Sequence, residues 1–346
     1  MKKVLFILCV VIFGVDAKIW HISPSGTGNR AEGTGWASAI QIDTLAVANL
    51  TAGDTIYILG GEHTVNGNID ISTLDGTGSN TYAIIGLKST TTNEGINIAK
   101  SDWAYGSGRP LINCSSFQLK TGDYYNIRQL SFRGTVSTAA LYTGGNCFVD
   151  SCKFDCVGGY GLQILNYCTV LCSEFYANYA GNVLSTGSGC NIYYNKFISD
   201  PALSSTGISL GGSNNTISFN IFNRFNIAIN VATRNQNYVL NNVFYANNTD
   251  VSAMTANRCL FINNINDSTK TTSYYWTTGG IKSNVFLYNH GDDARCAKMW
   301  GDSIPTGDIF GPHGTTTGDP KFLDAASRNF LIIDTTSPCY KSGLGL

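Results

Sequence analysis

The sequence predicts an all-β fold, a parallel β-solenoid whose coils are about 22 residues long. A short phrase recurs along the chain and ends each time in a large apolar residue, at separations of 22, 21, 22, 25, 22, 21 and 21 residues, which indicates a repeat architecture. An aliphatic residue stands five positions before every ending. Charged residues make up only 13% of the chain and Gly contributes 38 residues, a composition typical of many short strands and tight turns. The endings are Phe132, Phe154, Phe175, Phe197, Phe222, Phe244, Ile265 and Phe286.

Two aligned columns within the repeat have different expected roles. The aliphatic column should point inward and stack on itself, because successive coils lie about 4.8 Å apart. The column two positions before each ending becomes Asn in the last five coils. Asn tolerates the left-handed backbone of a sharp bend, and its amide both donates and accepts, so we expect an asparagine ladder along the axis. The first column is Ile127, Val149, Val170, Ile192, Ile217, Val239, Leu260 and Ile281; the second is Leu130, Cys152, Ser173, Asn195, Asn220, Asn242, Asn263 and Asn284.

A second strand per coil is expected after each Phe, over residues 162–165, 183–185, 208–210 and 227–231. In these strands the large aliphatic residues should face inward. The outward set is then Gln163, Val183, Ser209 and Asn230. This outer face is predicted to contain neither a carboxylate nor a basic side chain.

The N-terminus has the features of a secretory signal: Lys2 and Lys3, an apolar run over residues 4–14, and the small-residue cleavage site Val15-Asp16-Ala17. We predict that residues 1–17 are a signal peptide and that the mature chain starts at Lys18. The apolar run is about half of the roughly 20 residues needed to span a membrane. The prediction is therefore a secreted, extracellular or cell-surface protein that is not inserted in a membrane after signal cleavage.

The formal charge argues against a nucleic-acid partner. Removing Lys2, Lys3 and Asp16 changes the balance from 22 basic and 23 acidic residues to 20 and 22, a net charge of −2. Such a chain has no basic surplus with which to bind phosphates.

The mature chain is predicted to be a single β-helix domain, residues 18–346. Residues 18–60 form an N-terminal cap with an amphipathic helix over Trp36 to Leu50, which would cover the open end of the stack. Residues 125–286 contain the regular repeats, and residues 287–346 contain irregular C-terminal coils and a closing cap.

Both ends of the chain resemble the right-handed parallel β-helix proteins of the pectate-lyase-like superfamily. The resemblance rests on an Ile-Ser-Pro-Ser-Gly-Thr-Gly opening at 22–28, a Gly-Thr-Gly-Trp-Ala-Ser turn at 33–38 and Ala-Gly-Asp-Thr-Ile-Tyr-Ile at 52–58, with Gly-Asp-Pro-Lys-Phe at 318–322 and Ser-Pro-Cys at 337–339 near the C-terminus. It implies a single-stranded right-handed parallel β-helix with an N-terminal capping helix, and a protein that binds or degrades a polysaccharide or cell-surface glycan. An enzyme of this kind would be a polysaccharide lyase or a glycoside hydrolase.

Pectate lyases, as the resemblance implies, cleave acidic polysaccharides with a Lys or Arg base, often with Ca²⁺ held by acidic residues on the outer face of one parallel sheet. The base removes the proton α to a carboxylate, and the cation neutralises the developing charge. The alternative is a non-catalytic surface, adhesive or virion-type stalk whose function is rigidity and attachment. Oligomerisation is compatible with either function.

Three groups of residues are candidates for chemistry. Lys153, Glu174 and Lys196 precede the terminal Phe on three consecutive coils; they are either a base and anion-binding column or a solvated salt ladder. Tyr274, Tyr275 and Trp276 form the densest aromatic cluster and could stack on sugar rings or pack at a widened coil. Asp292 and Asp293, beside a His and an Arg, are candidate Ca²⁺ ligands or part of a polar loop.

Ten of the eleven cysteines remain after Cys9 leaves with the signal. Cys147, Cys168 and Cys190 share one column, seven residues before their endings. Parallel neighbours have Cβ atoms about one strand spacing apart, slightly beyond disulfide range, so we expect a stack of buried thiols there. Cys152 and Cys172 are offset by one position and are the better candidates for a disulfide.

Overall fold

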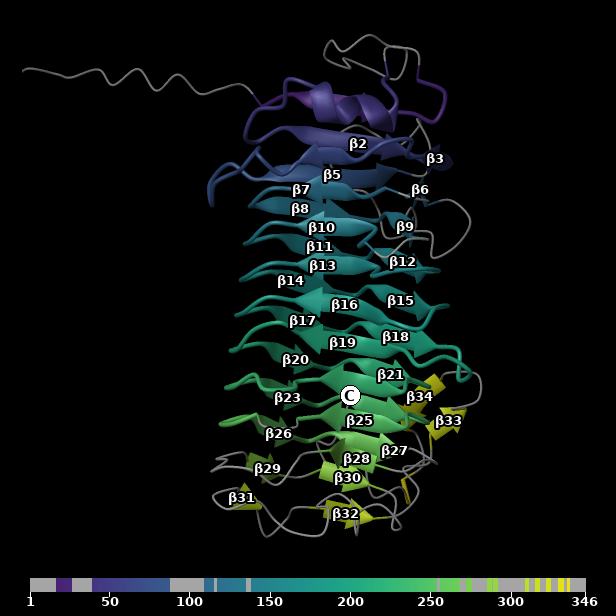
Figure 1. The fold of residues 1–346 in the computed structure, drawn as a ribbon, viewed down its shortest axis with the longest axis vertical. Helices are drawn as coiled ribbons and strands as arrows, with labels where there is room; N and C mark the ends of the chain where they lie inside the picture. Colours follow the sequence, from purple (N-terminus) through teal and green to yellow (C-terminus); the bar gives the residue numbers. More distant parts are fainter. Residues whose placement is uncertain are drawn as a thin grey trace, which may run out of the picture.

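The chain forms an elongated right-handed stack of coils with three parallel sheets along its length (Figure 1). The structure is a computed structural model. It describes residues 17–26, 39–87, 109–114, 117–134, 138–253 and 256–267, and the strand or turn segments 272–275, 285–287, 289–291, 309–310, 315–317, 322–324, 329–332 and 335–336. Each coil between β2 and β28 contributes one strand to each sheet, so strands that are neighbours in a sheet come from successive coils.

The largest sheet, sheet A, has twelve strands in the order β1-β2-β5-β8-β11-β14-β17-β20-β23-β26-β29-β31. Their bounds are Ile19–Ile22, Thr55–Leu59, Tyr82–Leu87, Tyr125–Arg128, Phe148–Asp150, Thr169–Leu171, Asn191–Tyr193, Thr216–Ser218, Tyr238–Leu240, Leu260–Ile262, Val285–Leu287 and Ile309–Phe310.

Sheet B has eleven strands in the order β3-β6-β9-β12-β15-β18-β21-β24-β27-β30-β32. Their bounds are Glu62–Thr64, Leu111–Asn113, Ser131–Gly134, Lys153–Cys156, Glu174–Ala177, Lys196–Ser199, Ile221–Asn223, Val243–Tyr245, Ile265–Asp267, Asn289–Gly291 and Thr315–Thr317.

Sheet C has nine strands, taken here in chain order as β4-β7-β10-β13-β16-β19-β22-β25-β28. Their bounds are Ile69–Ile71, Leu119–Thr121, Leu141–Thr143, Leu162–Ile164, Asn182–Thr186, Thr206–Leu210, Ile227–Asn230, Thr249–Ser252 and Thr272–Tyr275. The four second strands predicted from the sequence correspond to β13, β16, β19 and β22, which confirms their assignment.

The interior is lined by stacked identical or similar side chains. From sheet B, the Phe endings stack ring on ring with centroid separations of 4.6 to 5.2 Å along the series Phe132, Phe154, Phe175, Phe197, Phe222 and Phe244. From sheet A, the aliphatic column from Ile127 to Val239 is completely buried. The rings are stacked nearly parallel to one another, and such aromatic pairs stabilise the fold beyond the effect of the area that they bury.

The sequence alignment of the repeats is wrong at its last two endings, Ile265 and Phe286. Phe244 pairs with Asn266, not with Ile265, and Phe286 continues the inner column of sheet A by pairing with Phe261. Ile265 is apolar for another reason. It packs on the outer face of sheet B with Val243, against Ile332, so it is covered from outside the stack.

The cover on that outer face is a C-terminal antiparallel hairpin, β33 (Phe322–Asp324) and β34 (Asn329–Ile332). Figure 1 shows it beside β21. Ile332 contacts the apolar outer cluster of sheet B. A local alternation pattern cannot tell burial inside the stack from burial under such a hairpin, and this explains the misalignment.

The asparagine ladder is confirmed, with one change of position. The fully buried residues Asn195, Asn220, Asn242 and Asn264 each accept, through Oδ1, the backbone N–H of the equivalent residue one coil earlier, at 2.8 to 3.0 Å. The left-handed backbone belongs to the residue before each ladder position, as at Tyr194, Phe219 and Asn263, with φ of 54° to 58°. The ladder Asn is therefore selected for its hydrogen bonds, and Asn263 is the bend residue rather than the ladder residue; Asn284 lies outside the described residues.

The cysteine column replaces Asn in a second ladder, at the turn that enters sheet A. The Sγ of Cys168 accepts the backbone N–H of Cys147 at 3.4 Å, and further along Asn215 accepts the N–H of Cys190 at 2.8 Å. All three cysteines are buried and unbridged, as predicted. The disulfide between Cys152 and Cys172 is wrong: Cys152 points into the core, whereas Cys172 occupies the bend position and is exposed.

This arrangement predicts a specific pattern of thiol reactivity. The eight described cysteines are all free, and of them only Cys172 is exposed. Burial raises the thiol pKa of Cys114 and Cys152 to about 12 and also raises that of Cys172, so access to solvent is what distinguishes Cys172 from the buried thiols. In native protein, we expect one of these eight thiols to react quickly with a thiol reagent. In denatured, unreduced protein, at least eight thiols should react. A denatured count below eight would contradict the structure, and Cys172→Ser should abolish the fast reaction.

The N-terminal cap differs in part from the predicted helix. Within the range Trp36 to Leu50, the described residues contain a six-residue 3-10 helix, η2, over Ile42–Val47; residues 36–38 lie outside the described part. The buried side chains of Ile42 and Leu45 join the core, and Figure 1 shows the short helix at the N-terminal end of the stack. The capping helix over Trp36 to Leu50 stays a prediction. No helix among the described residues is long and apolar enough to cross a membrane.

Candidate functional site

The outer face of sheet C carries one continuous column of polar side chains. Strand register places them one above another, from Asp70 on β4 and Lys120 on β7 onward. Their separation is therefore about one strand spacing, roughly 4.8 Å. The column reads Asp70, Lys120, Tyr142, Gln163, Ser185, Ser209, Asn230 and Ser252.

The outward assignment is confirmed for Gln163, Ser209 and Asn230, which are half-buried on the surface. Val183 was wrongly assigned outward, because it is 1% exposed and belongs to the core. Strand β16 has two successive buried residues, Val183 and Leu184. The register pairs Asn182 with Thr206 and Leu184 with Ile208, so strict alternation starts only at Leu184.

The charged end of this column was missed by sequence reasoning. Asp70 Oδ2 lies 3.5 Å from Lys120 Nζ, with side-chain exposures of 47% and 33%. The short patterns Ile-Asp-Ile and Leu-Lys-Thr alternate between buried and outward residues and are the signal that could have identified both strands. A surface pair of this kind contributes little to stability, and its exposure leaves the ammonium open to a ligand.

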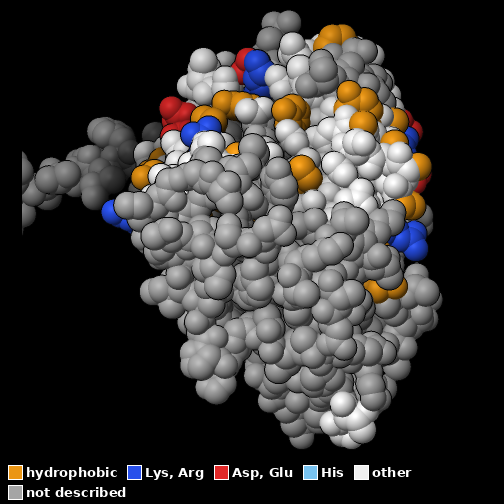
Figure 2. All heavy atoms as spheres, turned by 60° about the horizontal axis from the view of Figure 1, so that its bottom comes forward, with side chains coloured by type: hydrophobic (Ala, Val, Ile, Leu, Met, Phe, Trp, Pro, Cys, Tyr) orange, Lys and Arg blue, Asp and Glu red, His pale blue; other side chains and the backbone are white. Residues whose placement is uncertain are grey.

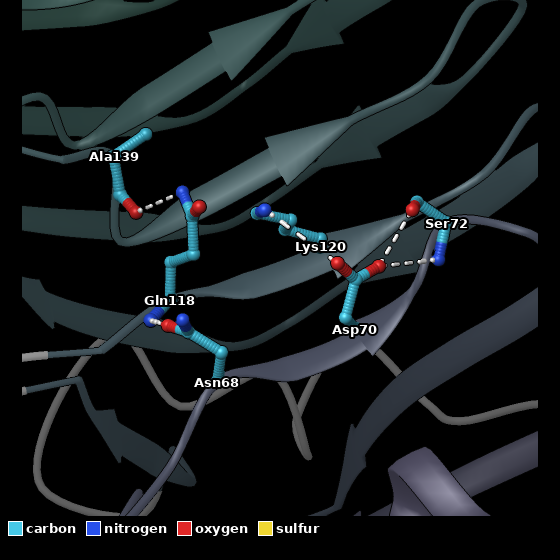
Figure 3. Close-up of polar contacts among 6 residues, drawn as sticks. All are labelled: Asn68, Asp70, Ser72, Gln118, Lys120 and Ala139. Carbon is cyan, nitrogen blue, oxygen red and sulfur yellow. Dashed lines mark hydrogen bonds and ion pairs between the residues drawn. The ribbon is translucent and has the colours of Figure 1, made fainter.

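Ser72 holds Asp70 in place (Figure 3). The Ser72 hydroxyl donates to Asp70 Oδ1 at 2.5 Å, and the Ser72 backbone N–H donates to the same oxygen at 3.1 Å. These hydrogen bonds, and after them the charge of Lys120, lower the pKa of Asp70. Since a lowered carboxyl pKa keeps the charged form until the pH falls through it, the pair with Lys120 persists through weakly acidic and neutral pH.

A pocket of about 470 Å³ opens beside Lys120, lined by Ser72, Gln118, Lys120, Thr138, Ala139, Tyr142, Tyr160 and Gln163. Two hydrogen bonds hold Gln118 in the lining of this pocket (Figure 3). Its Nε2 donates to the Ala139 carbonyl at 3.2 Å, and its backbone N–H donates to Asn68 Oδ1 at 3.2 Å. The lining combines one cation, two phenol rings and four amide or hydroxyl side chains. Hydroxyl-rich ligands with an anionic group match this donor and acceptor set.

The predicted charged column lies on sheet B, away from this pocket. Register pairs Lys153 with Glu174 and Glu174 with Lys196, so their alignment on three coils is confirmed. A salt ladder is not formed. Tyr176 intervenes: its hydroxyl donates to Glu174 Oε2 at 2.9 Å, and Lys153 Nζ lies 4.8 Å from its ring centre, a cation–π contact.

The other predicted site residues are placed only in part. Tyr274 and Tyr275 end β28, the last strand of sheet C, where they pair with Val251 and Ser252; Trp276, Asp292 and Asp293 lie outside the described residues. In the part of the chain that the structure describes, no cluster of three or more His, Cys, Asp or Glu side chains is arranged to hold a metal ion. Ca²⁺ binding by Asp292 and Asp293 therefore stays a prediction, because both residues lie outside the described part of the chain.

Charged side chains are sparse over the described surface. On the face shown in Figure 2, those of Lys, Arg, Asp and Glu are few and lie toward the margin of the described part, with some acidic and basic side chains side by side. Ion pairs among the described residues include Asp70 with Lys120 on sheet C and Arg133 with Asp155 on sheet B.

Known proteins resemble this chain in structure but not in sequence. No protein-family model and no curated protein matches it. Pectate lyase Pel9A superposes with a TM-score of 0.58 at 13% identity, over 90% of this chain and 85% of that one. An alginate lyase from Paenibacillus sp. str. FPU-7 gives 0.53 at 14% identity, over 86% and 99%. A mannuronic acid specific polysaccharide family 6 lyase from human gut microbiota gives 0.51 at 14% identity, over 80% of this chain; the chain spans 65% of that enzyme's length.

These likenesses define the class of fold. The chain has the fold of a right-handed parallel β-helix, as the sequence predicted. At such low identity the likeness concerns the fold alone, because one fold supports many functions. The function has to be argued from the pocket.

Proposed function

We propose that this is a secreted polysaccharide-active protein that binds a uronate-containing glycan in the pocket on sheet C. The observation that carries the proposal is the exposed Lys120 ammonium, held by Asp70 at 3.5 Å, at the mouth of a pocket lined with phenol, amide and hydroxyl groups. Lys120 would bind the uronate carboxylate, while the rings of Tyr142 and Tyr160 offer faces for sugar rings. The signal-like segment 1–17 supports secretion.

The pocket favours lyase chemistry over hydrolysis. Glycoside hydrolases of the usual kind need two carboxyl groups flanking the scissile bond, and the described lining contains none. β-Elimination needs a base for the proton α to the carboxylate, an acid for the leaving oxygen and a positive charge near the carboxylate. Lys120 supplies the positive charge near the carboxylate, and Tyr142, its register neighbour on the adjacent strand, supplies a phenol for proton transfer.

The distribution of charge also suggests the kind of glycan. Beyond Lys120 the outward column of sheet C is uncharged, from Tyr142 through Ser252. A glycan with a uronate in every unit would meet one cation and then a series of neutral side chains. A heteroglycan with single uronates among neutral sugars fits the described face better, since each buried carboxylate needs a partner.

Binding should depend on Lys120. Losing a hydrogen bond to a charged group costs about 1.5–3 kcal/mol, so we expect Lys120→Ala to weaken binding about 10- to 100-fold. Titration calorimetry with polygalacturonate, alginate and uronate-bearing heteroglycan oligosaccharides measures this, and the ultraviolet absorbance of unsaturated uronate products, with and without Ca²⁺, reports elimination. Because Asp70 keeps its charge, the binding should be insensitive to pH through the weakly acidic range.

Two further variants locate the site. Arg234→Ala removes an exposed cation from a turn beyond β22 and should leave binding unchanged. Lys153→Ala tests the charged column of sheet B; if it abolished binding while Lys120→Ala did not, the site would lie on sheet B. An absence of binding to every glycan would reject the proposal and favour the non-catalytic stalk.

A further inference from the structure

The carboxylate of Asp54 is buried in the N-terminal cap. Its side chain is completely inaccessible and accepts four hydrogen bonds: from the backbone N–H of Lys18 at 2.8 Å, and at 2.9 Å from Trp20 Nε1, the Thr51 backbone N–H and the Thr51 hydroxyl. None of these donors is a Lys, Arg or His side chain. A buried carboxylate is costly even with hydrogen bonds unless a positive charge compensates it.

Among the described residues, the hydrogen bonds between the start of the chain and the cap begin at Lys18. The Lys18 N–H donates to Asp54, and the Lys18 carbonyl accepts the backbone N–H of Thr55 at 2.9 Å. The next residue, Ile19, pairs with Thr55 in the β1–β2 ladder. Ala17, immediately before, is exposed. The first described residue that hydrogen-bonds to the cap is thus the residue that the Val-Asp-Ala signal predicts as the mature start.

We propose that removal of residues 1–17 converts the Lys18 amide nitrogen into an α-ammonium group that forms a salt bridge with the buried Asp54 carboxylate. A processing peptidase would hydrolyse the Ala17–Lys18 bond: the hydroxyl of water goes to the Ala17 carbonyl carbon, the C–N bond breaks, and the Lys18 nitrogen takes one proton from water and a second from solvent. The group 2.8 Å from Asp54 Oδ1 then carries a positive charge and three protons. Maturation thereby completes the cap.

The pH dependence of this salt bridge has a definite sign. A carboxylate partner raises the α-amino pKa above its ordinary 7.7–8.0. Its stabilisation is therefore complete below about pH 7.7 and is lost as the pH rises through the raised value. Besides the Lys18 side chain, the titratable groups that interact with Asp54 are Tyr82 and Tyr125, and Asp75 acts on the same two tyrosines. Burial raises the pKa of Tyr82 and of Tyr125, so both tyrosines titrate above this window.

The test compares two N-termini of one protein. The mature chain beginning at Lys18 and the same chain with Gly-Gly-Ala ahead of Lys18 are unfolded in urea from about pH 6 to pH 10, a range that brackets the ordinary α-amino pKa. Other titrating groups are common to both and cancel. We expect the mature chain to have the higher midpoint at neutral pH, by about tenfold in the folding equilibrium constant for one unit of pKa shift. The difference should vanish near pH 10.

Two results would overturn the proposal: equal midpoints at every pH, or an exported protein whose first residue, by mass and N-terminal sequencing, is not Lys18. Asp54→Asn should remove the difference between the two N-termini. Because this variant can also prevent folding, the comparison of the two chains with Asp54 intact decides the matter without it.

Discussion

Phe175→Ala should lower the free energy of unfolding by about 3–5 kcal/mol, the range for removing a large aromatic side chain from a packed core. Phe175 is completely buried. Its ring lies 4.8 Å from that of Phe154 and 4.6 Å from that of Phe197, so the variant leaves a cavity between two rings that are fixed by their own coils. The midpoint and slope of urea unfolding measure the loss.

The matched control is Tyr179→Ala, which truncates an aromatic side chain that is 44% exposed and should change stability by less than about 0.5 kcal/mol. Phe175→Leu should fall between the two. A loss of stability below about 1 kcal/mol for Phe175→Ala would show that neighbouring coils collapse into the cavity. That result would contradict our expectation that the close-packed stack is rigid and keeps the cavity.

Asn220→Ala should lower the free energy of unfolding about as much as Phe175→Ala, because it removes buried hydrogen bonds. The Asn220 Oδ1 accepts the backbone N–H of Asn195 at 2.9 Å, and its Nδ2 donates to the carbonyls of Ile192 and Ser218 at 2.8 and 3.0 Å. All these groups lie in a region without access to solvent. Each buried group left without a partner costs about 1–3 kcal/mol, so we expect a total loss of about 3–5 kcal/mol in urea unfolding.

Asn220→Ser distinguishes hydrogen bonding from packing. In an earlier coil Ser173 occupies the same column, where its Oγ accepts the Cys152 N–H at 3.1 Å and donates to the Leu171 carbonyl at 2.9 Å. Asn220→Ser should therefore recover part of the loss. Asn178→Ala, which removes an exposed amide bonded to Asp155, should cost less than about 1 kcal/mol. If Ser and Ala were equally damaging at 220, the ladder would not act through the N–H acceptor.

The candidate site was less accessible to sequence reasoning than the fold. The column of Lys153, Glu174 and Lys196 could be found because it lies inside the regular repeat, and its register is confirmed. Lys120 and Asp70 lie in early coils, where loops of irregular length separate three-residue strands. Forty-nine positions lie between them in the sequence, and only strand pairing makes them neighbours.

The wrong predictions for Ile265 and Val183 also arise from contacts that the sequence pattern does not contain. Ile265 was aligned with the inner Phe column because an apolar residue looks the same in sequence whether it is covered by the stack or by a distant hairpin. The contact with Ile332 decides the matter, and it joins segments 67 residues apart. Val183 likewise follows the spacing of an outward residue, but the irregular backbone at β16 turns it inward.

The sequence alone determined the β-helix, its coil length, the inner aliphatic and Phe columns and the existence of an asparagine ladder. Each of these repeats at a nearly constant spacing, and stacking at a constant rise converts such a period directly into contact between equivalent residues. The tertiary structure alone decided which residue of each bend is left-handed, how the C-terminal hairpin covers sheet B, and that Lys120, paired with Asp70, lines one pocket together with Tyr142. Those features depend on contacts between segments of irregular spacing, for which the chain carries no periodic signal.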